Sequence, residues 1–104
     1  EFGVKTDIND FFELPSEIKL EQNYPNPFNP TTTIKFNIGN YTNNKVSIKL
    51  YDVLGNEIST LVDDYKKPGS YELNFNAKDL SSGVYFYKLQ VGNFVQTKKM
   101  ILIK

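Results

Sequence analysis

Carboxylates are the main side chains in this chain that could do chemistry, and four of them fall where the sequence predicts turns. These are Asp52, Asp63, Asp64 and Asp79. Aspartate in a turn usually accepts hydrogen bonds from its own backbone, whereas clustered carboxylate oxygens can bind calcium. We therefore expect turn-forming roles for all four, and the adjacent pair Asp63 and Asp64 is the candidate for a calcium site.

The chain of 104 residues contains no His and no Cys. It thus lacks the commonest general base, the commonest transition-metal ligand and any thiolate, which excludes serine triads and zinc sites. An enzyme would need two carboxylates facing each other in a cleft, which a sandwich this small rarely forms. The sequence predicts a protein that is not an enzyme and needs no cofactor.

The distribution of charge argues against nucleic acid as a partner. All 12 basic residues are Lys, so no guanidinium group is available to bind phosphate or guanine in a bidentate way. Residues 1–21 carry six acids and two lysines, a net charge of −4, and the remainder is +4 because the whole chain is neutral. No apolar stretch approaches the roughly 20 residues of a membrane span, and the N-terminus does not resemble a signal peptide.

Aromatic residues, 14% of the chain, leave a second function open. At alternating spacing most of them are expected in a core, but five could lie outside it and form a surface on which sugars stack. These five are Tyr24, Tyr41, Tyr51, Tyr65 and Phe86. In that case the chain would be a structural or carbohydrate-binding accessory module of a secreted enzyme.

The elements that must position these residues are strands. Alternating, β-branched and aromatic runs separated by Asn, Gly, Pro and Asp predict an all-β antiparallel sandwich of about seven strands. We expect them at residues 19–22, 32–38, 46–51, 57–62, 71–76, 84–91 and 94–103. Gly55 and the pair Gly92-Asn93 predict hairpin turns, and Lys98-Lys99 predicts a bulge because it interrupts the alternation.

The chain divides into an acidic linker, residues 1–18, and a folded domain, residues 19–104. The first segment has no sustained period and contains Pro15, and its Glu1-Phe2 could be a cloning scar. Three prolines between Asn23 and Pro30 predict an extended, rigid loop rather than a central strand. We expect the chain to be the detachable C-terminal module of a larger secreted protein.

The segment Leu20-Glu21-Gln22-Asn23-Tyr24-Pro25-Asn26-Pro27-Phe28-Asn29-Pro30-Thr31-Thr32 resembles the opening of the type A C-terminal sorting domain of the type IX secretion system. The resemblance continues through Leu50 to Gly55, Pro68-Gly69, Ser82 to Tyr87 and Lys98 to Lys104, so it covers residues 20–104. An Ig-like module of flagellar hook-capping proteins has overlapping features. The terminal Lys104 favours the sorting domain.

This resemblance implies an Ig-like sandwich that directs a larger cargo protein of Bacteroidetes-like bacteria across the outer membrane to the surface. The implied partners are the outer-membrane translocon, its shuttle, a sortase-like peptidase and the N-terminal cargo domain of the parent protein. Cleavage would fall within residues 1–20 or before them. The implied recognition residues are Pro25, Asn26, Pro27, Gly83, Val84, Tyr85, Lys98, Lys99 and Lys104.

Overall fold

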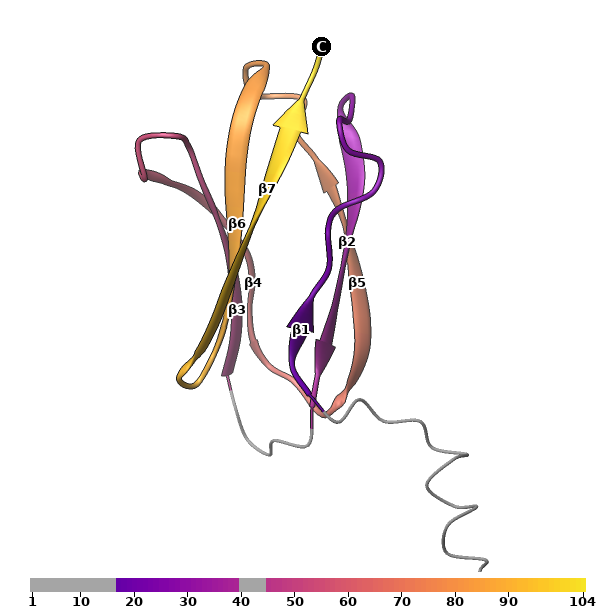
Figure 1. The fold of residues 1–104 in the computed structure, drawn as a ribbon, viewed down its shortest axis with the longest axis vertical. Coiled ribbons are helices and arrows are strands. Elements are labelled where there is room, and N and C mark those ends of the chain that lie inside the picture. Colours follow the sequence, from indigo (N-terminus) through magenta and orange to yellow (C-terminus); the bar gives the residue numbers. More distant parts are fainter. Residues whose placement is uncertain (1–16, 40–44) are drawn as a thin grey trace, which may run out of the picture.

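Seven strands form two antiparallel sheets that pack face to face as a sandwich (Figure 1). The computed structural model describes residues 17–39 and 45–104, so most of the predicted linker and the predicted loop at residues 40–44 lie outside the described part. The strands are β1 (Lys19–Leu20), β2 (Thr31–Ile38), β3 (Lys45–Tyr51), β4 (Glu57–Tyr65), β5 (Gly69–Asn76), β6 (Gly83–Val91) and β7 (Phe94–Leu102).

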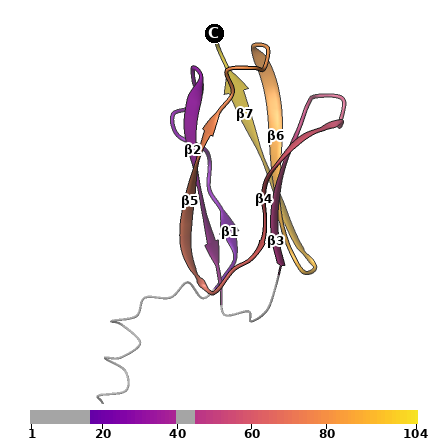
Figure 2. The same ribbon diagram turned by 180° about the vertical axis from the view of Figure 1, so that it is seen from behind.

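The smaller sheet has the order β1-β2-β5 and the larger sheet the order β4-β3-β6-β7. Strands β1 and β7 lie on one side of the sandwich, and β4 and β5 lie on the other, as both views show (Figures 1 and 2). The C-terminus is at the opposite end of the sandwich from residue 17 (Figure 1). In the part of the chain that the structure describes, no helix is long and apolar enough to cross a membrane.

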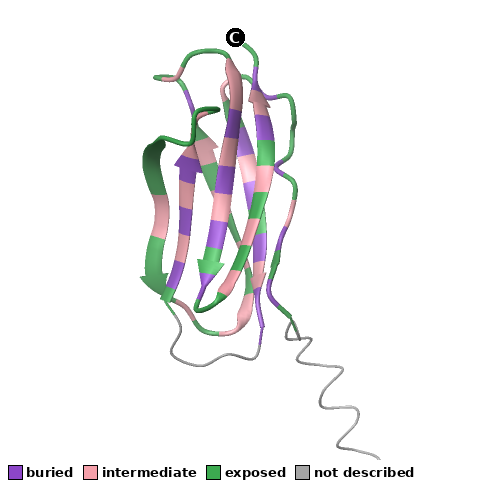
Figure 3. Ribbon diagram, turned by 60° about the vertical axis from the view of Figure 1, so that its left-hand side comes forward, coloured by how far each residue is buried: buried purple, intermediate pink, exposed green. Residues whose placement is uncertain are grey.

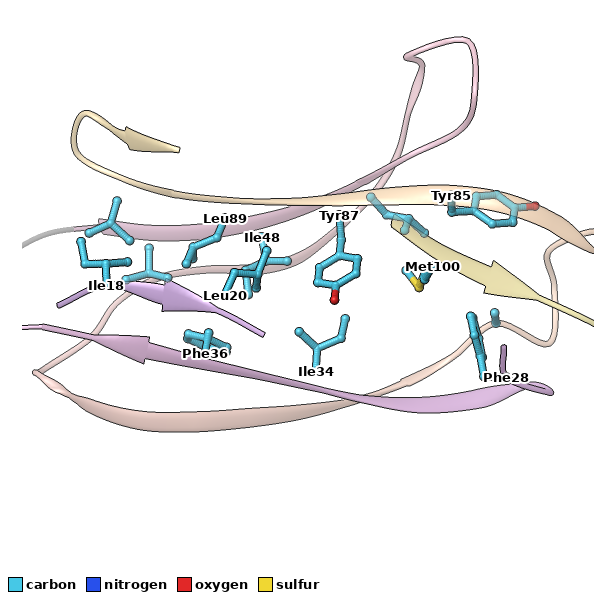
Figure 4. Close-up of a cluster of buried hydrophobic side chains, with 14 of the residues drawn as sticks. Ile18, Leu20, Phe28, Ile34, Phe36, Ile48, Tyr85, Tyr87, Leu89 and Met100 are labelled. Carbon is cyan, nitrogen blue, oxygen red and sulfur yellow. The ribbon is translucent and has the colours of Figure 1, made fainter. Parts of the chain in front are cut away.

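The core fills the space between the two sheets because every second side chain of β2, β3 and β6 points inward. This alternation appears as purple bands along the strands in Figure 3. The Tyr87 ring lies near the middle of the cluster (Figure 4). Strand β5 contributes side chains that pack against the core but stay half-buried, namely Tyr71, Leu73 and Phe75.

The bulge predicted at Lys98-Lys99 is wrong. Strands β6 and β7 pair without interruption from Val91 opposite Phe94 to Gly83 opposite Leu102. Lys98 therefore keeps its inward register opposite Tyr87, and it is only half-buried because β7 is the last strand of its sheet. A lysine in that position can keep its alkyl stem along apolar surface and its ammonium group in water, so the alternation needs no bulge.

Irregular pairing occurs instead between β3 and β4. The register shifts between Ile48 and Lys49 and again between Leu50 and Tyr51. Strand β4 also continues through Asp63 and Asp64, which pair with β3, so the predicted connection over residues 63–69 is shorter than expected. Pairing with a neighbouring strand outweighs the poor strand propensity of Asp here.

Candidate recognition site

The proline-rich segment between β1 and β2 lies along the outer edge of β7. The Asn26 side-chain oxygen accepts a hydrogen bond from the Ile101 N–H at 2.9 Å. The Phe28 N–H donates to the Ile101 carbonyl at 3.0 Å, and the Phe28 carbonyl accepts from the Ile103 N–H at 2.9 Å. The loop thus satisfies backbone groups that the last strand would otherwise expose.

The same edge is covered further along by two glutamines. The Gln22 side-chain amide donates to the Lys99 carbonyl at 2.6 Å, and the Gln96 side-chain oxygen accepts from the Leu20 N–H at 2.9 Å. Residues 20–28 therefore contact β7 over most of its length, and they connect the two sheets on this side of the sandwich.

Two buried polar residues hold the loop in shape. The Asn23 amide donates to the Pro25 carbonyl at 3.2 Å and to the Thr32 hydroxyl oxygen at 3.0 Å. The Thr32 hydroxyl in turn donates to the Pro25 carbonyl at 2.9 Å. The sequence alone does not identify Asn23 or Thr32 as a site residue. The signal for Thr32 is its place two residues before Ile34, in the inward register of β2.

Tyr87 anchors the start of the loop to the core. Its hydroxyl oxygen accepts a hydrogen bond from the Asn23 N–H at 2.7 Å and its O–H donates to the Glu21 carbonyl at 2.7 Å. Burial raises the pKa of Tyr87 to about 12, because the charged phenolate would be taken out of water. The hydroxyl therefore stays neutral over the physiological pH range and keeps its hydrogen bonds to both backbone groups.

The strand β6 begins directly beside these contacts. Gly83 and Val84 pair with Leu102 and Ile101, so the segment beginning at Gly83 and the end of β7 are adjacent in the sheet. Val84 is half-exposed, whereas the Tyr85 ring is buried and its O–H donates to the Ser81 carbonyl at 2.6 Å. Pro25, Asn26 and Pro27 are all exposed.

The family of this chain follows from a match to a known protein family. Residues 22–104 match the family described as the secretion system C-terminal sorting domain. The chain belongs to this family. It is a non-catalytic signal module of the type IX secretion system, and cargo proteins that carry it are secreted or displayed at the cell surface through contact with that system's machinery. None of the curated proteins compared with the chain matches it.

The three lysines implied as recognition residues, Lys98, Lys99 and Lys104, do not lie in one place. Lys99 and Lys98 point to opposite faces of β7, because successive residues of a strand alternate. Lys104 lies beyond the strand, where its backbone N–H donates to the Ser82 hydroxyl at 3.0 Å and its ammonium group donates to the Lys78 carbonyl at 2.6 Å. Lys99 and Lys104 are exposed, and Lys98 is half-buried.

The calcium site predicted at Asp63 and Asp64 gains no support from the structure. Both residues lie in β4 rather than in a turn, and adjacent strand residues point to opposite faces. Asp63 forms an ion pair with Lys45 at 3.2 Å, and Asp64 accepts from the Tyr65 N–H at 2.8 Å. Among residues 17–39 and 45–104 no three acidic side chains are grouped as metal ligands.

The other two aspartates do lie in turns, as predicted. Asp79 is in the turn that follows β5. The Asp52 carboxylate accepts hydrogen bonds from the backbone N–H groups of Leu54 and Asn56, both at 2.9 Å, and from the Asn56 side chain. The hydrogen bond from the Asn56 backbone is the main reason why the pKa of Asp52 lies below its usual value. Gly55, with φ of 88°, completes this turn in the left-handed region that favours glycine.

The aromatic side chains proposed as a sugar platform are not assembled in one place. Tyr24 is 80% exposed in the loop before β2, and Tyr65 is 66% exposed at the end of β4. Tyr51 and Phe86 are cross-strand neighbours on the outer face of the larger sheet, far along β3 from Tyr65. Tyr41 lies outside the described residues.

Proposed function

We propose that the sorting domain presents one composite surface to the outer-membrane translocon and its shuttle. The surface would consist of the loop Pro25, Asn26 and Pro27, the start of β6 at Gly83 and Val84, and the two exposed lysines, Lys99 in β7 and Lys104 after it. Lys98 points to the opposite face of β7 and is not included. Tyr85 would contribute through packing, since its ring is buried. The observation that carries the proposal is the set of hydrogen bonds that join Asn26 and Phe28 with Ile101 and Ile103 at the end of the chain.

Those hydrogen bonds support recognition because they make the surface rigid before any partner arrives. A preformed surface loses less conformational entropy on binding than a mobile one. The prolines restrict the loop backbone, and Asn23 and Thr32 fix the Pro25 carbonyl from the inside. A receptor could therefore meet exposed proline rings and ammonium groups in a fixed arrangement.

The acidic segment before the sandwich would be the linker to an N-terminal cargo domain. A sortase-like peptidase would cleave within residues 1–20 or before them. The buried side chain of Ile18 favours cleavage on the N-terminal side of that residue, because a peptidase needs an extended, accessible segment. Residues from Glu17 onward would then remain together as the released domain.

The test is export of a reporter fused to residues 17–104 in a host with a functional type IX system. Reversing the charge of Lys99 and Lys104 by Glu substitution changes only exposed side chains. We expect surface delivery to fall by about tenfold or more, since reversed charge at an interface is strongly unfavourable. Export at the unsubstituted level would refute the proposed surface.

The matched control is the double substitution Lys35→Glu and Lys67→Glu, which makes the same change in net charge at exposed positions away from β7. We expect normal export from this variant. Thermal unfolding of both variants should agree within about 3 °C, so that loss of export reflects recognition rather than unfolding. Equal losses in the two double variants would also contradict the proposal.

A further inference from the structure

The outer face of the larger sheet is polar at one end and apolar at the other. The end near the β6–β7 hairpin carries the outward residues Lys45, Ser47 and Gln90. The end near the C-terminus carries outward residues that are half-exposed and apolar, namely Tyr51, Val84, Phe86 and Ile101. A solvent-facing sheet surface needs no such apolar end for folding, which suggests a contact surface.

A hollow lies at this apolar end. Its volume is about 290 Å³, which suits one or two side chains of a partner rather than a large ligand. Tyr51 and Phe86 are directly opposite each other on β3 and β6 and form its aromatic part. The full lining is Tyr51, Asp52, Val53, Gly55, Phe86, Lys88 and Thr97.

The turn between β3 and β4 carries two exposed apolar side chains, of which Val53 lines the hollow and Leu54 is its neighbour in the sequence. Val53 is 63% exposed and Leu54 is 83% exposed. Their backbone is held by the Asp52 carboxylate and by two backbone hydrogen bonds, both at 3.0 Å: the Asp52 N–H donates to the Asn56 carbonyl, and the Gly55 N–H donates to the Asp52 carbonyl. Large apolar side chains on a fixed turn are available for binding with little further loss of entropy.

The charges around the hollow select the kind of partner. Lys88 lies in its lining, and Lys99 is the cross-strand neighbour of Phe86 on the same face. Among residues 17–39 and 45–104 neither lysine forms an ion pair, whereas the nearby Glu57 is paired with Lys49 at 3.5 Å. The Asp52 carboxylate already accepts hydrogen bonds from Leu54 and Asn56 within its own turn. The hollow is therefore apolar with a positive rim.

We propose that this hollow binds an extended acidic segment of a partner protein, with an aliphatic or aromatic side chain in the hollow and neighbouring carboxylates near Lys88 and Lys99. A peptide is favoured over a sugar for two reasons. Val53, in the lining, is a branched aliphatic group, which contacts apolar side chains. The Lys88 ammonium group lies 5.1 Å from the centroid of the Tyr51 ring, so it occupies a ring face on which a sugar would stack.

The experiment uses the full chain, labelled with ¹⁵N, and a synthetic ten-residue peptide that has a central Leu-Phe pair and two Glu residues on each side. We expect concentration-dependent chemical-shift changes centred on Tyr51, Val53 and Phe86. Val53→Ser and Lys88→Glu should each weaken binding about tenfold, as expected for truncating a central contact or reversing a rim charge in a small interface. Tyr65→Ser, which removes an exposed ring from the far end of β4, should leave the affinity unchanged.

Two altered peptides complete the test. Replacing the four Glu residues by Lys, or the Leu-Phe pair by Ser, should abolish the shifts. Absence of shifts with the acidic peptide at millimolar concentration, equal binding of the basic peptide, or shifts centred away from the hollow would overturn the proposal. Equal binding of a trigalacturonate probe would overturn the choice of a peptide. These measurements need no secretion system. Peptide binding can therefore be absent while reporter export is normal for the proposed surface, and peptide binding can be present while the export test refutes that surface.

Discussion

The two edges of the larger sheet are protected in different ways. On one side, β7 is covered by residues 20–28, which hydrogen-bond to its backbone through Gln22, Asn26 and Phe28. On the other side, β4 has no described strand beyond it and relies on its own features. These are two bulges against β3 and the charged pair Asp63 and Asp64, which discourage pairing with another molecule.

The difference has a functional meaning. Side chains and bulges protect β4 without bringing distant segments together. Covering β7 with chain instead places Asn26 next to Ile101, 75 residues away in the sequence. Only the covered edge therefore combines features from the beginning and the end of the domain, and this is where we place the recognition surface.

The largest expected effect comes from removing the apolar anchor of the covered edge. Phe28→Ala leaves a cavity where the ring is buried and packs 6.4 Å from the Phe75 ring, and it should lower the free energy of unfolding by about 3–5 kcal/mol. Urea denaturation measures this loss. Ile58→Ala, on partly exposed β4, should cost under about 1 kcal/mol. Similar losses in both variants would show that the two edges are equivalent.

The next effect concerns the hydroxyl that anchors the loop. Tyr87→Phe leaves the Asn23 N–H and the Glu21 carbonyl without their buried partner and should cost about 2–3 kcal/mol. Tyr65→Phe, at an exposed position of the open edge, should change stability by less than about 0.5 kcal/mol. A loss below about 1 kcal/mol for Tyr87→Phe would mean that the hydroxyl is not needed to hold the loop.

The stability of the unsubstituted protein and that of Tyr87→Phe should depend differently on pH. The pKa of Tyr87 is raised from 10.0 in the unfolded chain to about 12 in the folded protein. Its contribution to stability is therefore complete below pH 10 and declines as the pH rises toward 12, because the unfolded state releases the phenolic proton first. The stability difference between the unsubstituted protein and Tyr87→Phe should narrow over this interval in thermal melts. A constant difference would contradict the assigned pKa.

A smaller effect is expected from one hydrogen bond of the loop. Asn26→Ala removes the acceptor of the Ile101 N–H and should cost about 1 kcal/mol. Hydrogen exchange at the Ile101 amide should accelerate by about fivefold, corresponding to this loss. Asn29→Ala in the same exposed loop is the control, and it should leave that exchange rate unchanged. Unaltered exchange in Asn26→Ala would place the protection of this edge elsewhere.

The smallest effect on stability should occur at the open edge, with a different consequence. Asp64 pairs with Val46 in the inward register of β4, so Asp64→Val removes a charge that disfavours addition of another strand. We expect a stability change under about 1 kcal/mol but dimers or larger species in light scattering after gel filtration. Asp79→Val, in a turn, should stay monomeric. A monomeric Asp64→Val protein would show that the bulges alone protect this edge.

The sequence was sufficient to predict the fold where alternation is regular. Ile34, Phe36 and Ile38 indicated the inward face of β2, and Gly92-Asn93 indicated the β6–β7 hairpin. It failed at Asp63 and Asp64, because their inclusion in β4 depends on β3, a partner that local propensity does not reveal. The run of four apolar residues from Val84 to Tyr87 was also ambiguous, since both of its faces are apolar.

The candidate site was predictable in its parts but not in its assembly. The prolines and lysines could be named from the sequence, whereas the hydrogen bonds between Ile101 and Asn26 and between Asn23 and Tyr87 join segments more than 60 residues apart. The buried role of Asn23 is hard to predict because polar residues in a proline-rich stretch are usually exposed. Thr32 is in the inward register of β2, but its partners in the loop are not evident from the sequence.

The cover over β7 also has a kinetic consequence. Contacts between residues so distant in sequence carry a large loop-closure entropy and tend to make folding slow. The contact between residues 20–28 and β7 cannot form until the strands between them have been brought together. The combined surface is then absent from partly folded chains and is present only in molecules whose folding is finished. A receptor that binds this surface would therefore bind fully folded molecules and would not bind partly folded ones.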